Sequence, residues 1–282
     1  MDNKPLIIRS MDKTEFSLAI DWAAQEGWNP GLCDNQSYYV ADPDGFLIGL
    51  VDGEPVATIS VVKYNANFGF IGFYIVKPEY RGRGYGLQIW QAGLAKLKGC
   101  NIGLDGVIDQ QDNYTKSGFR LAYRNIRFEG RGGAQPVTNN SVVDLDSIAF
   151  SMIEQYNQPL FPAPRAAFDL VWLEQSNATT RGVIEDGHLR GYGVIRQCRD
   201  GYKIGPLYAD TPGFADSIYQ ALIATVGDVS VFLDVPEVNQ DALMLAQRYQ
   251  MKAAFETARM YSGDFPDIRL DKVYGVASFE IG

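Results

Sequence analysis

The sequence predicts an α/β (α+β) protein made of two similar units, each with a central mixed, mostly antiparallel sheet flanked by helices. Its 282 residues exceed the length of a usual single domain. Strand-like and helix-like segments recur in the same order in both halves. Val76 matches Leu207 and Phe119 matches Met251, so the halves repeat at offsets of 131 and 132 residues.

The first half is predicted to alternate strands and helices. A strand at 6–9 precedes a helical stripe at 14–25, with Asp12 in the N-cap position. Turn residues then separate three antiparallel strands. These strands cover 46–51, 56–64 and 68–76. After a helix at 86–98, a parallel strand at 102–108, a short helix at 112–118 and a strand at 120–128 complete the first unit.

A glycine-rich loop with two arginines follows the third antiparallel strand. Pro78 ends that strand, and residues 81–86 are Arg-Gly-Arg-Gly-Tyr-Gly. Glycines let the backbone approach a ligand closely, and a helix N-terminus presents unpaired N–H groups. Arginines add countercharge at the same place, so the loop is predicted to bind a phosphate.

Two other interpretations of this loop remain. The glycines can serve a tight turn, with the arginines on a solvated rim. Alternatively, the loop belongs to a dinucleotide-binding fold, but that fingerprint needs a third glycine where Leu87 stands.

The pattern Arg81-x-x-Gly84-x-Gly86, after Val76-x-Pro78 at a strand end, resembles the acyl-CoA pyrophosphate loop of the GNAT superfamily of N-acetyltransferases. The resemblance implies transfer of an acetyl group from acetyl-CoA to a primary amine by direct attack in a ternary complex. It also implies that backbone N–H groups polarise the thioester carbonyl. The cofactor-binding residues that it implies are Ile75, Val76, Arg81, Gly82, Arg83, Gly84, Tyr85 and Gly86.

Tyr114 is the catalytic residue that the resemblance implies. The family places a tyrosine just before Lys/Arg-x-Gly-Phe, and Tyr114 stands two residues before Lys116 and four before Gly118. A phenol with an ordinary pKa of about 10 can donate a proton to the leaving thiolate. The alternative is a tyrosine that caps the cleft without taking part in chemistry.

The acceptor pocket is predicted from an aromatic, turn-rich segment. Trp28 and Asp34 are the candidate acceptor-binding residues, although the aromatic side chains there can also hold a loop against the core. The base that deprotonates the amine is left open among Asp34, Asp105 and Asp109. Each of these carboxylates can instead be a surface or capping group.

A linker at 131–140, rich in glycine, divides the chain into units 1–130 and 141–282. The second unit is predicted to be a degenerate copy. Residues 210–214 are Asp-Thr-Pro-Gly-Phe, without arginine, and Ala246 stands where the family usually has tyrosine. His188 is assigned to a hairpin turn. Its predicted elements are helices near 146–158, 164–175, 211–226 and 239–249 and strands near 179–184, 191–197, 202–208, 229–235 and 255–260.

Composition predicts a soluble cytoplasmic protein. Apolar residues make up 46% and charged residues 21%, and the N-terminus has no apolar signal region. The three cysteines lack CxxC pairing, which favours a reducing compartment and no metal. A net charge of −9 disfavours nucleic acid and membrane partners and allows a cationic acceptor, for which a small molecule is favoured over a protein. An acetyl-CoA sensor and a structural or dimerisation protein remain as alternatives.

Overall fold

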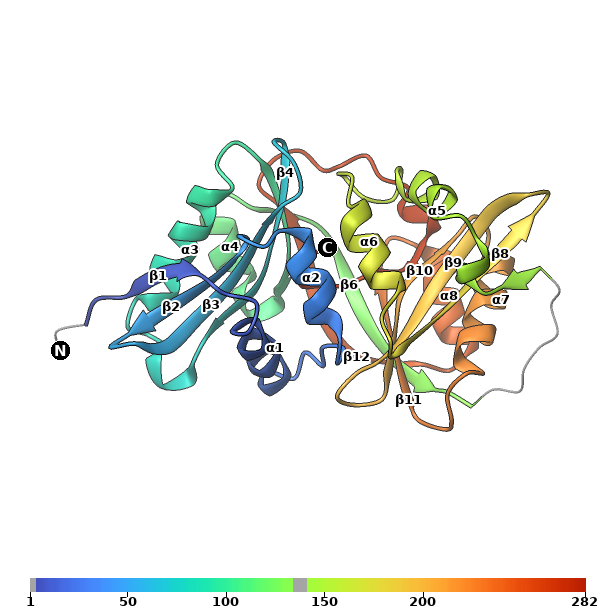
Figure 1. Cartoon of the computed structure of the whole chain (residues 1–282), viewed down its shortest axis with the longest axis horizontal. Coiled ribbons are helices and arrows are strands. Elements are labelled where there is room, and N and C mark those ends of the chain that lie inside the picture. Colours follow the sequence, from blue (N-terminus) through green and yellow to red (C-terminus); the bar gives the residue numbers. More distant parts are fainter. Residues whose placement is uncertain (1–3, 134–140) are drawn as a thin grey trace.

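A computed structural model describes residues 4–133 and 141–282 (Figure 1). Its strands follow one continuous path, β1-β2-β3-β4-β5-β12-β6-β11-β10-β9-β8-β7, and β13 pairs with β10. The mixed α/β architecture that the sequence predicts is therefore confirmed, but the two units share a single sheet.

The first half follows the predicted order of elements. Its strands and helices are β1 (Ile7–Ser10), α1 (Phe16–Gln25), α2 (Asp34–Ala41), β2 (Phe46–Val51), β3 (Glu54–Lys63), β4 (Phe68–Val76), the 3₁₀ turn η1 (Pro78–Tyr80), α3 (Tyr85–Lys96), β5 (Asn101–Val107), η2 (Ile108–Gln110), α4 (Gln111–Lys116) and β6 (Arg120–Arg131). Helix α2 is the element that the sequence did not predict, because its polar and aromatic residues give no helical stripe.

The second half repeats this order. It contains β7 (Val142–Val143), η3 (Leu145–Ser147), α5 (Phe150–Asn157), α6 (Ala166–Leu173), β8 (Ala178–Glu185), β9 (His188–Gln197), β10 (Tyr202–Ala209), α7 (Pro212–Ile223), β11 (Ser230–Pro236), α8 (Gln240–Arg248), β12 (Lys252–Tyr261), η4 (Leu270–Lys272) and β13 (Val273–Gly275). The short strands β7 and β13 were not predicted. Residues 134–140 of the predicted linker lie outside the described residues, whereas Arg131, its first residue, ends strand β6.

The two halves exchange their last long strands. Strand β12 of the second half pairs antiparallel with β5, and β6 of the first half pairs antiparallel with β11. The exchanged strands also pair with each other, so they lie side by side at the centre of the molecule (Figure 1). Residues up to 128 therefore do not form a separate sheet, because β12 supplies the strand next to β5.

Three buried ion pairs join the halves across this centre. Arg259 on β12 pairs with Asp105 on β5 at 2.6 Å, Arg127 on β6 pairs with Asp234 on β11 at 2.6 Å, and Arg196 on β9 pairs with Asp34 on α2 at 2.8 Å. Burial opposes ionisation of Asp234, yet Arg127 holds the pKa of its carboxyl below the ordinary value. Breaking one of these pairs would leave a buried charge without compensation.

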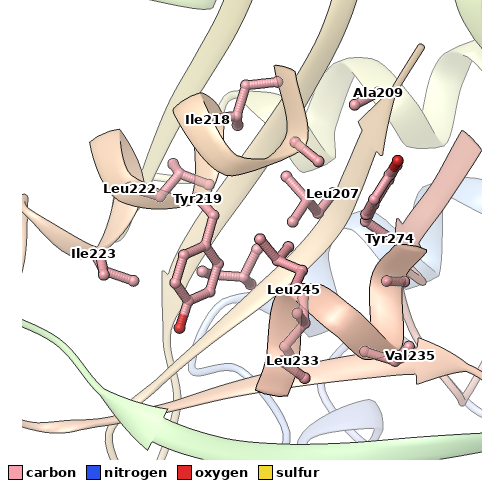
Figure 2. Packing of buried hydrophobic residues seen from close by; sticks show 14 of the residues in the cluster. Leu207, Ala209, Ile218, Tyr219, Leu222, Ile223, Leu233, Val235, Leu245 and Tyr274 are labelled. Carbon is pink, nitrogen blue, oxygen red and sulfur yellow. The ribbon is translucent and has the colours of Figure 1, made fainter. Parts of the chain in front are cut away.

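The core of the second half packs helices α7 and α8 against β10 and β11 (Figure 2). Ile218 and Leu222 on α7 recur at helical spacing and are fully buried. Leu207 on β10 and Leu233 on β11 meet them from the sheet. Each such side chain contributes about 1.5–3 kcal/mol through its removal from water.

Helices cover both faces of the first half's sheet, so the two faces of β4 serve different helices. Phe73 and Ile75 belong to the buried cluster that includes α1 and α2. Tyr74 and Val76, which alternate with them, pack against the cluster that includes Ile89 and Trp90 of α3. The side chains on one face of β4 thus contact α3, and those on the other face contact α1 and α2.

Candidate active site

Strands β4 and β5 separate partway along their length. Their parallel pairing ends at Ile71↔Leu104, although β4 continues to Val76. An irregularity in the β3–β4 register follows Gly72, and Phe73 there takes a φ of 45°. Bulges of this kind bend a strand away from its neighbour. The bend opens a space between β4 and β5.

A cavity of about 560 Å³ fills this space. Such a volume is typical of sites for small molecules. The loop before α3, helix α4, the α1–α2 loop, strand β12 and the C-terminal residues all line it. Both halves of the chain therefore build this cavity.

The predicted phosphate loop lies at the mouth of the cavity, where Gly82, Gly84 and Gly86 line it. Gly82 and Gly84 have φ values of 74° and 83°, which side chains rarely adopt. Gly84 is the N-cap of α3, and no side chain caps that helix. The N–H groups of its first turn are therefore open to an anion.

Gly86 serves close packing rather than an unusual backbone conformation. A Cβ atom there would lie 2.8 Å from the hydroxyl of Tyr74 and 3.2 Å from Val76. Tyr74 also packs on Trp90, with ring centroids 5.3 Å apart. The glycine thus lets α3 begin directly against β4.

The larger side chains of the loop make contacts within the protein, so they are less available to bind a phosphate than the sequence suggested. Arg81 donates through Nε to the carbonyl of Val76 at 2.8 Å and forms an ion pair with Glu26. Arg83 stacks over Tyr80 at 5.2 Å. Tyr85 is buried, and its hydroxyl donates to the carbonyl of Lys4 at 3.1 Å. Arg81 therefore holds the loop to the end of β4, and its predicted role as a countercharge to phosphate stays a prediction.

Ile75 and Val76 both line the cavity, but their N–H groups point in different directions. The N–H of Lys77 donates to the carbonyl of Val56 at 3.0 Å. The two residues before Lys77, Val76 and Ile75, pair with Ala57 and Thr58 of β3. N–H groups of an antiparallel strand point alternately to its two sides. The N–H of Ile75 is therefore directed toward β3, and that of Val76 toward the open side.

Tyr114 lies on α4 and lines the same cavity. It is buried, and its ring centroid lies 5.5 Å from that of Trp90. A side chain at Gly106 on β5 would clash with the Tyr114 ring, so this glycine makes room for it. Burial, and then the neighbouring Tyr74, raise the pKa of the Tyr114 phenol above its ordinary value.

Of the two predicted acceptor residues, Trp28 lines the cavity and Asp34 does not. Asp34 is fully buried and accepts two hydrogen bonds from Arg196, at 2.8 and 3.3 Å. Its Oδ2 also accepts the backbone N–H of Gly31 at 2.8 Å. The expectation for Asp34 is corrected: it joins α2 to the second half.

The other two candidate bases also line the cavity. Asp105 accepts hydrogen bonds from Arg259 at 2.6 and 2.8 Å and from Asn125 at 2.8 Å. Burial raises the pKa of Asp105, and the attraction of Arg259 opposes that rise. A carboxylate held this way is positioned as a structural ion rather than as a proton acceptor. Asp109 is exposed and lies in η2, directly before α4.

Four lining residues come from the second half and were missed by sequence reasoning. Phe255 and Thr257 lie on β12, and Phe279 and Glu280 belong to the C-terminal segment. Nothing local in their sequence marks them, because the strand exchange that brings them here depends on pairing between distant segments. Tyr74 was also missed.

Comparisons with known proteins agree with this geometry. A family model described as "Acetyltransferase (GNAT) family" matches residues 10–119. A second model, described as "Acetyltransferase (GNAT) domain", matches residues 153–275. Holothin acyltransferase from Pseudoalteromonas sp. (strain SANK 73390) is 30% identical over 269 residues, covering 95% of this chain and 92% of that protein. The chain belongs to the GNAT acetyltransferase family.

Two solved structures share this GNAT fold over their whole length. A candidate acetyltransferase from Pyrococcus horikoshii superposes with a TM-score of 0.84 at 23% identity, covering 100% of this chain and 98% of that one. A tandem GNAT protein from the clavulanic acid biosynthesis pathway has a TM-score of 0.64 at 11% identity, with coverage of 93% and 100%. Both likenesses concern the fold, and the second includes the tandem arrangement.

The second GNAT half closes the space that the first leaves open. Strands β10 and β11 pair in parallel only up to Ile204↔Leu233. Beyond that point β13 pairs with β10 at Leu207↔Gly275, and Val276 donates to the carbonyl of Asp234 on β11 at 2.9 Å. The chain's own backbone thus occupies this separation.

Residues 4–133 and 141–282 contain no cluster of metal-ligating side chains. Within the same ranges, no helix is both long and apolar enough to cross a bilayer. His188 is exposed, and its Nδ1 lies 2.8 Å from the carbonyl of Asp186 in the β8–β9 turn. The predicted hairpin position of this histidine is confirmed.

Proposed function

We propose that this GNAT protein transfers an acetyl group from acetyl-CoA to a primary amine by direct attack in a ternary complex. The observation that carries the proposal is one cavity between β4 and β5 that is lined by the predicted phosphate loop, by Tyr114 and by residues of both halves. An acyl donor and an amine bound in this cavity would meet between β4 and β5.

The open N–H groups at the start of α3 would hold the pyrophosphate of the donor. Gly82 and Gly84 carry no side chains, and no described atom lies within 4 Å of where a Cβ atom would stand at either residue. The N–H of Val76 points to the open side of β4, where it would stabilise the negative charge that develops on the thioester oxygen. The N–H of Val76 would thus stabilise the oxyanion, whereas the N–H of Ile75 faces β3 within the sheet.

Tyr114 would donate the proton that the departing thiolate needs. Because burial raises the pKa of its phenol, the hydroxyl stays protonated at neutral pH. General acids accelerate reactions by about 10²-fold at the low end of their usual range.

Direct attack is favoured over a covalent acyl-enzyme. The described residues that line the cavity include no cysteine, serine or lysine, which are common nucleophiles for acyl transfer. Cys33, Cys100 and Cys198 lie elsewhere.

A small-molecule acceptor is favoured over a protein. A volume of about 560 Å³ suits a compact ligand, and Trp28 and Phe279 supply aromatic walls. The acyltransferase that is 30% identical to this chain is named for one compound, holothin, as its acceptor.

The test is release of free CoA thiol from acetyl-, butyryl- and hexanoyl-CoA in the presence of a library of primary amines. We expect thiol release that depends on an amine and is fastest with the acetyl donor. Tight binding of acetyl-CoA without any amine-dependent release would instead favour a sensor. Failure to bind any acyl-CoA would favour a structural or dimerisation role.

A further inference from the structure

We propose that the carboxylate of Glu280 binds the acceptor as an ammonium ion and takes its proton before attack. The inference rests on the proposed acetyl transfer, and it names the acceptor class: an aliphatic primary amine that carries a positive charge at neutral pH. The base that sequence reasoning left open among three aspartates would then come from the C-terminal segment of the second half.

The backbone around Glu280 is fixed against β3 and β4. Ser60 on β3 donates to the carbonyl of Glu280 at 3.2 Å, and Tyr64 donates to the carbonyl of Ile281 at 2.8 Å. A side chain at Gly72 on β4 would clash with the backbone of Glu280. The close approach therefore requires glycine at the point where β4 bends.

The Glu280 carboxylate is buried without a cation in direct contact among the described residues. Its residue is only 4% exposed, and its Oε2 accepts from Ser278 at 2.6 Å and from Tyr38 at 3.2 Å. In the described part of the chain, Oε1 receives no hydrogen bond and neither oxygen has an ion-pair partner. Burial of an uncompensated carboxylate is costly, so a cationic ligand at this place would be stabilised.

Three buried acids near the centre of the molecule, of which only Asp105 lines the cavity, differ from Glu280 in this respect. Each is paired with an arginine. These pairs are Asp105–Arg259, Asp234–Arg127 and Asp34–Arg196. Three neighbouring acids are thus already neutralised, and Glu280 is the one that retains capacity for a ligand's charge.

Titratable groups face Glu280 from several elements. They are Tyr38 on α2, Asp105 on β5, Arg127 on β6 and Lys203 on β10. Lys203 is the nearby cation without an acid in hydrogen-bond contact, but its Nζ donates to the carbonyl of Asn29 at 2.9 Å and it does not line the cavity. Burial, and then Arg127, lower the pKa of Lys203, which weakens it further as a counterion.

Thr257 supplies a second acceptor for an ammonium ion. It lies on β12, lines the cavity and is only 2% exposed, and its Oγ1 has no hydrogen-bond partner among the described residues. Buried hydroxyls are normally satisfied, so this oxygen has capacity for a donor from a ligand. An ammonium ion has three N–H donors, which suits Glu280 Oε1 together with Thr257 Oγ1.

The proton balance then follows. Glu280 takes one proton from the bound ammonium, which leaves a neutral amine with a free electron pair. The nitrogen forms a bond to the acetyl carbon, and the bond between that carbon and sulfur breaks. Tyr114 gives its proton to the thiolate, and the second proton lost by the nitrogen restores the phenol. Glu280 releases its proton to solvent.

The test measures binding, so that it does not depend on turnover. Calorimetry would compare 2-phenylethylamine, which is cationic, with its neutral analogue 2-phenylethanol, each titrated into the CoA-loaded full chain. For Glu280→Gln we expect about 10- to 100-fold weaker binding of the amine and unchanged binding of the alcohol. Glu256→Gln is the matched control, because it removes the same charge from an exposed position next to Thr257 and should bind like the parent.

Equal affinity of the amine for the parent and Glu280→Gln would overturn the proposal, and so would a parent that binds no aliphatic ammonium from methyl- to hexylammonium. If Glu280→Gln failed to fold, Thr257→Val would replace it, with a smaller loss of amine affinity expected. Parental acetyl transfer by Glu280→Gln would reject this inference and leave the transferase standing. Glu280-dependent amine binding without thiol release would support this inference and reject the transferase.

Discussion

The two halves form the same pair of parallel strands and use the space beside it in opposite ways. In the first half, β4 and β5 separate after Ile71↔Leu104 and leave a cavity. In the second half, β10 and β11 separate after Ile204↔Leu233, and β13 fills the space. The difference shows that a site can be lost by filling it with the chain itself, without a change of fold.

The helices that follow these strands differ in the same way. Helix α3 begins after glycines with open amides, whereas the side chain of Thr211 accepts the N–H of Phe214 at the start of α7. Pro212 has no N–H to offer. The segment that closes the second half then continues to Phe279 and Glu280 in the first half's cavity. The second half is therefore a contributor to the site rather than an independent remnant.

The largest effect should come from breaking a contact that joins the halves. Arg259→Ala leaves the Asp105 side chain, which is 0% exposed, as a buried charge without its partner. We expect a loss of about 3–5 kcal/mol in the free energy of unfolding. Because β12 lies in the first half's sheet, both halves should unfold in one transition, as measured by denaturant titration with circular dichroism and tryptophan fluorescence.

Arg131→Ala is the control for this variant. The Arg131–Asp228 pair also joins β6 to the second half, but its side chains are 59% and 80% exposed. Such a pair is screened by solvent, so stability should stay close to that of the parent. Two separate transitions, or equal losses in both variants, would show that the exchanged strands do not make one cooperative unit.

The next largest effect should come from removing the phenol hydroxyl of Tyr114 in the first half. Tyr114→Phe keeps the packing against Trp90 and removes the proton of the hydroxyl. The rate at saturating substrate should fall about 10²-fold, while acetyl-CoA affinity and thermal stability stay nearly unchanged. Tyr219→Phe, at a buried tyrosine of the second half, should keep the parental rate. A full rate in Tyr114→Phe would remove this residue from the mechanism and leave it as packing.

Local patterns allowed the first half's loop to be predicted from sequence, and nonlocal pairing explains most of what was missed. Gly82, Gly84 and the start of α3 are adjacent in sequence, so their spacing indicates an anion site directly. Thr257 enters the cavity because β12 crosses to β5, and Glu280 enters it because the C-terminal segment packs against β3 and β4. Asp34 was misplaced for a related reason, since its partner Arg196 lies in the other half.

A smaller effect should distinguish the two helix starts. Gly84→Val forces a β-branched residue into a φ of 83°, which costs about 1–3 kcal/mol and should weaken acetyl-CoA binding about 10-fold. Gly213→Val, at the start of α7, should leave binding unchanged. Calorimetry should also give one acetyl-CoA per chain for the parent. Two equivalent sites, or equal losses in both variants, would contradict the view that β13 closes the second half.

The smallest effect should come from Arg81, because its side chain is half exposed and already committed to Glu26 and to the carbonyl of Val76. If it holds the loop to β4, Arg81→Ala should weaken acetyl-CoA binding by less than about fivefold. Glu26→Gln should weaken it similarly, and the double variant should lose no more than either single one, since both changes break the same contact. Additive losses that grow at low ionic strength would instead show that Arg81 acts as a countercharge to the phosphates, independently of Glu26. The second half has neither residue at α7, so this double-mutant cycle measures what the first half gains from attaching its loop to its strand.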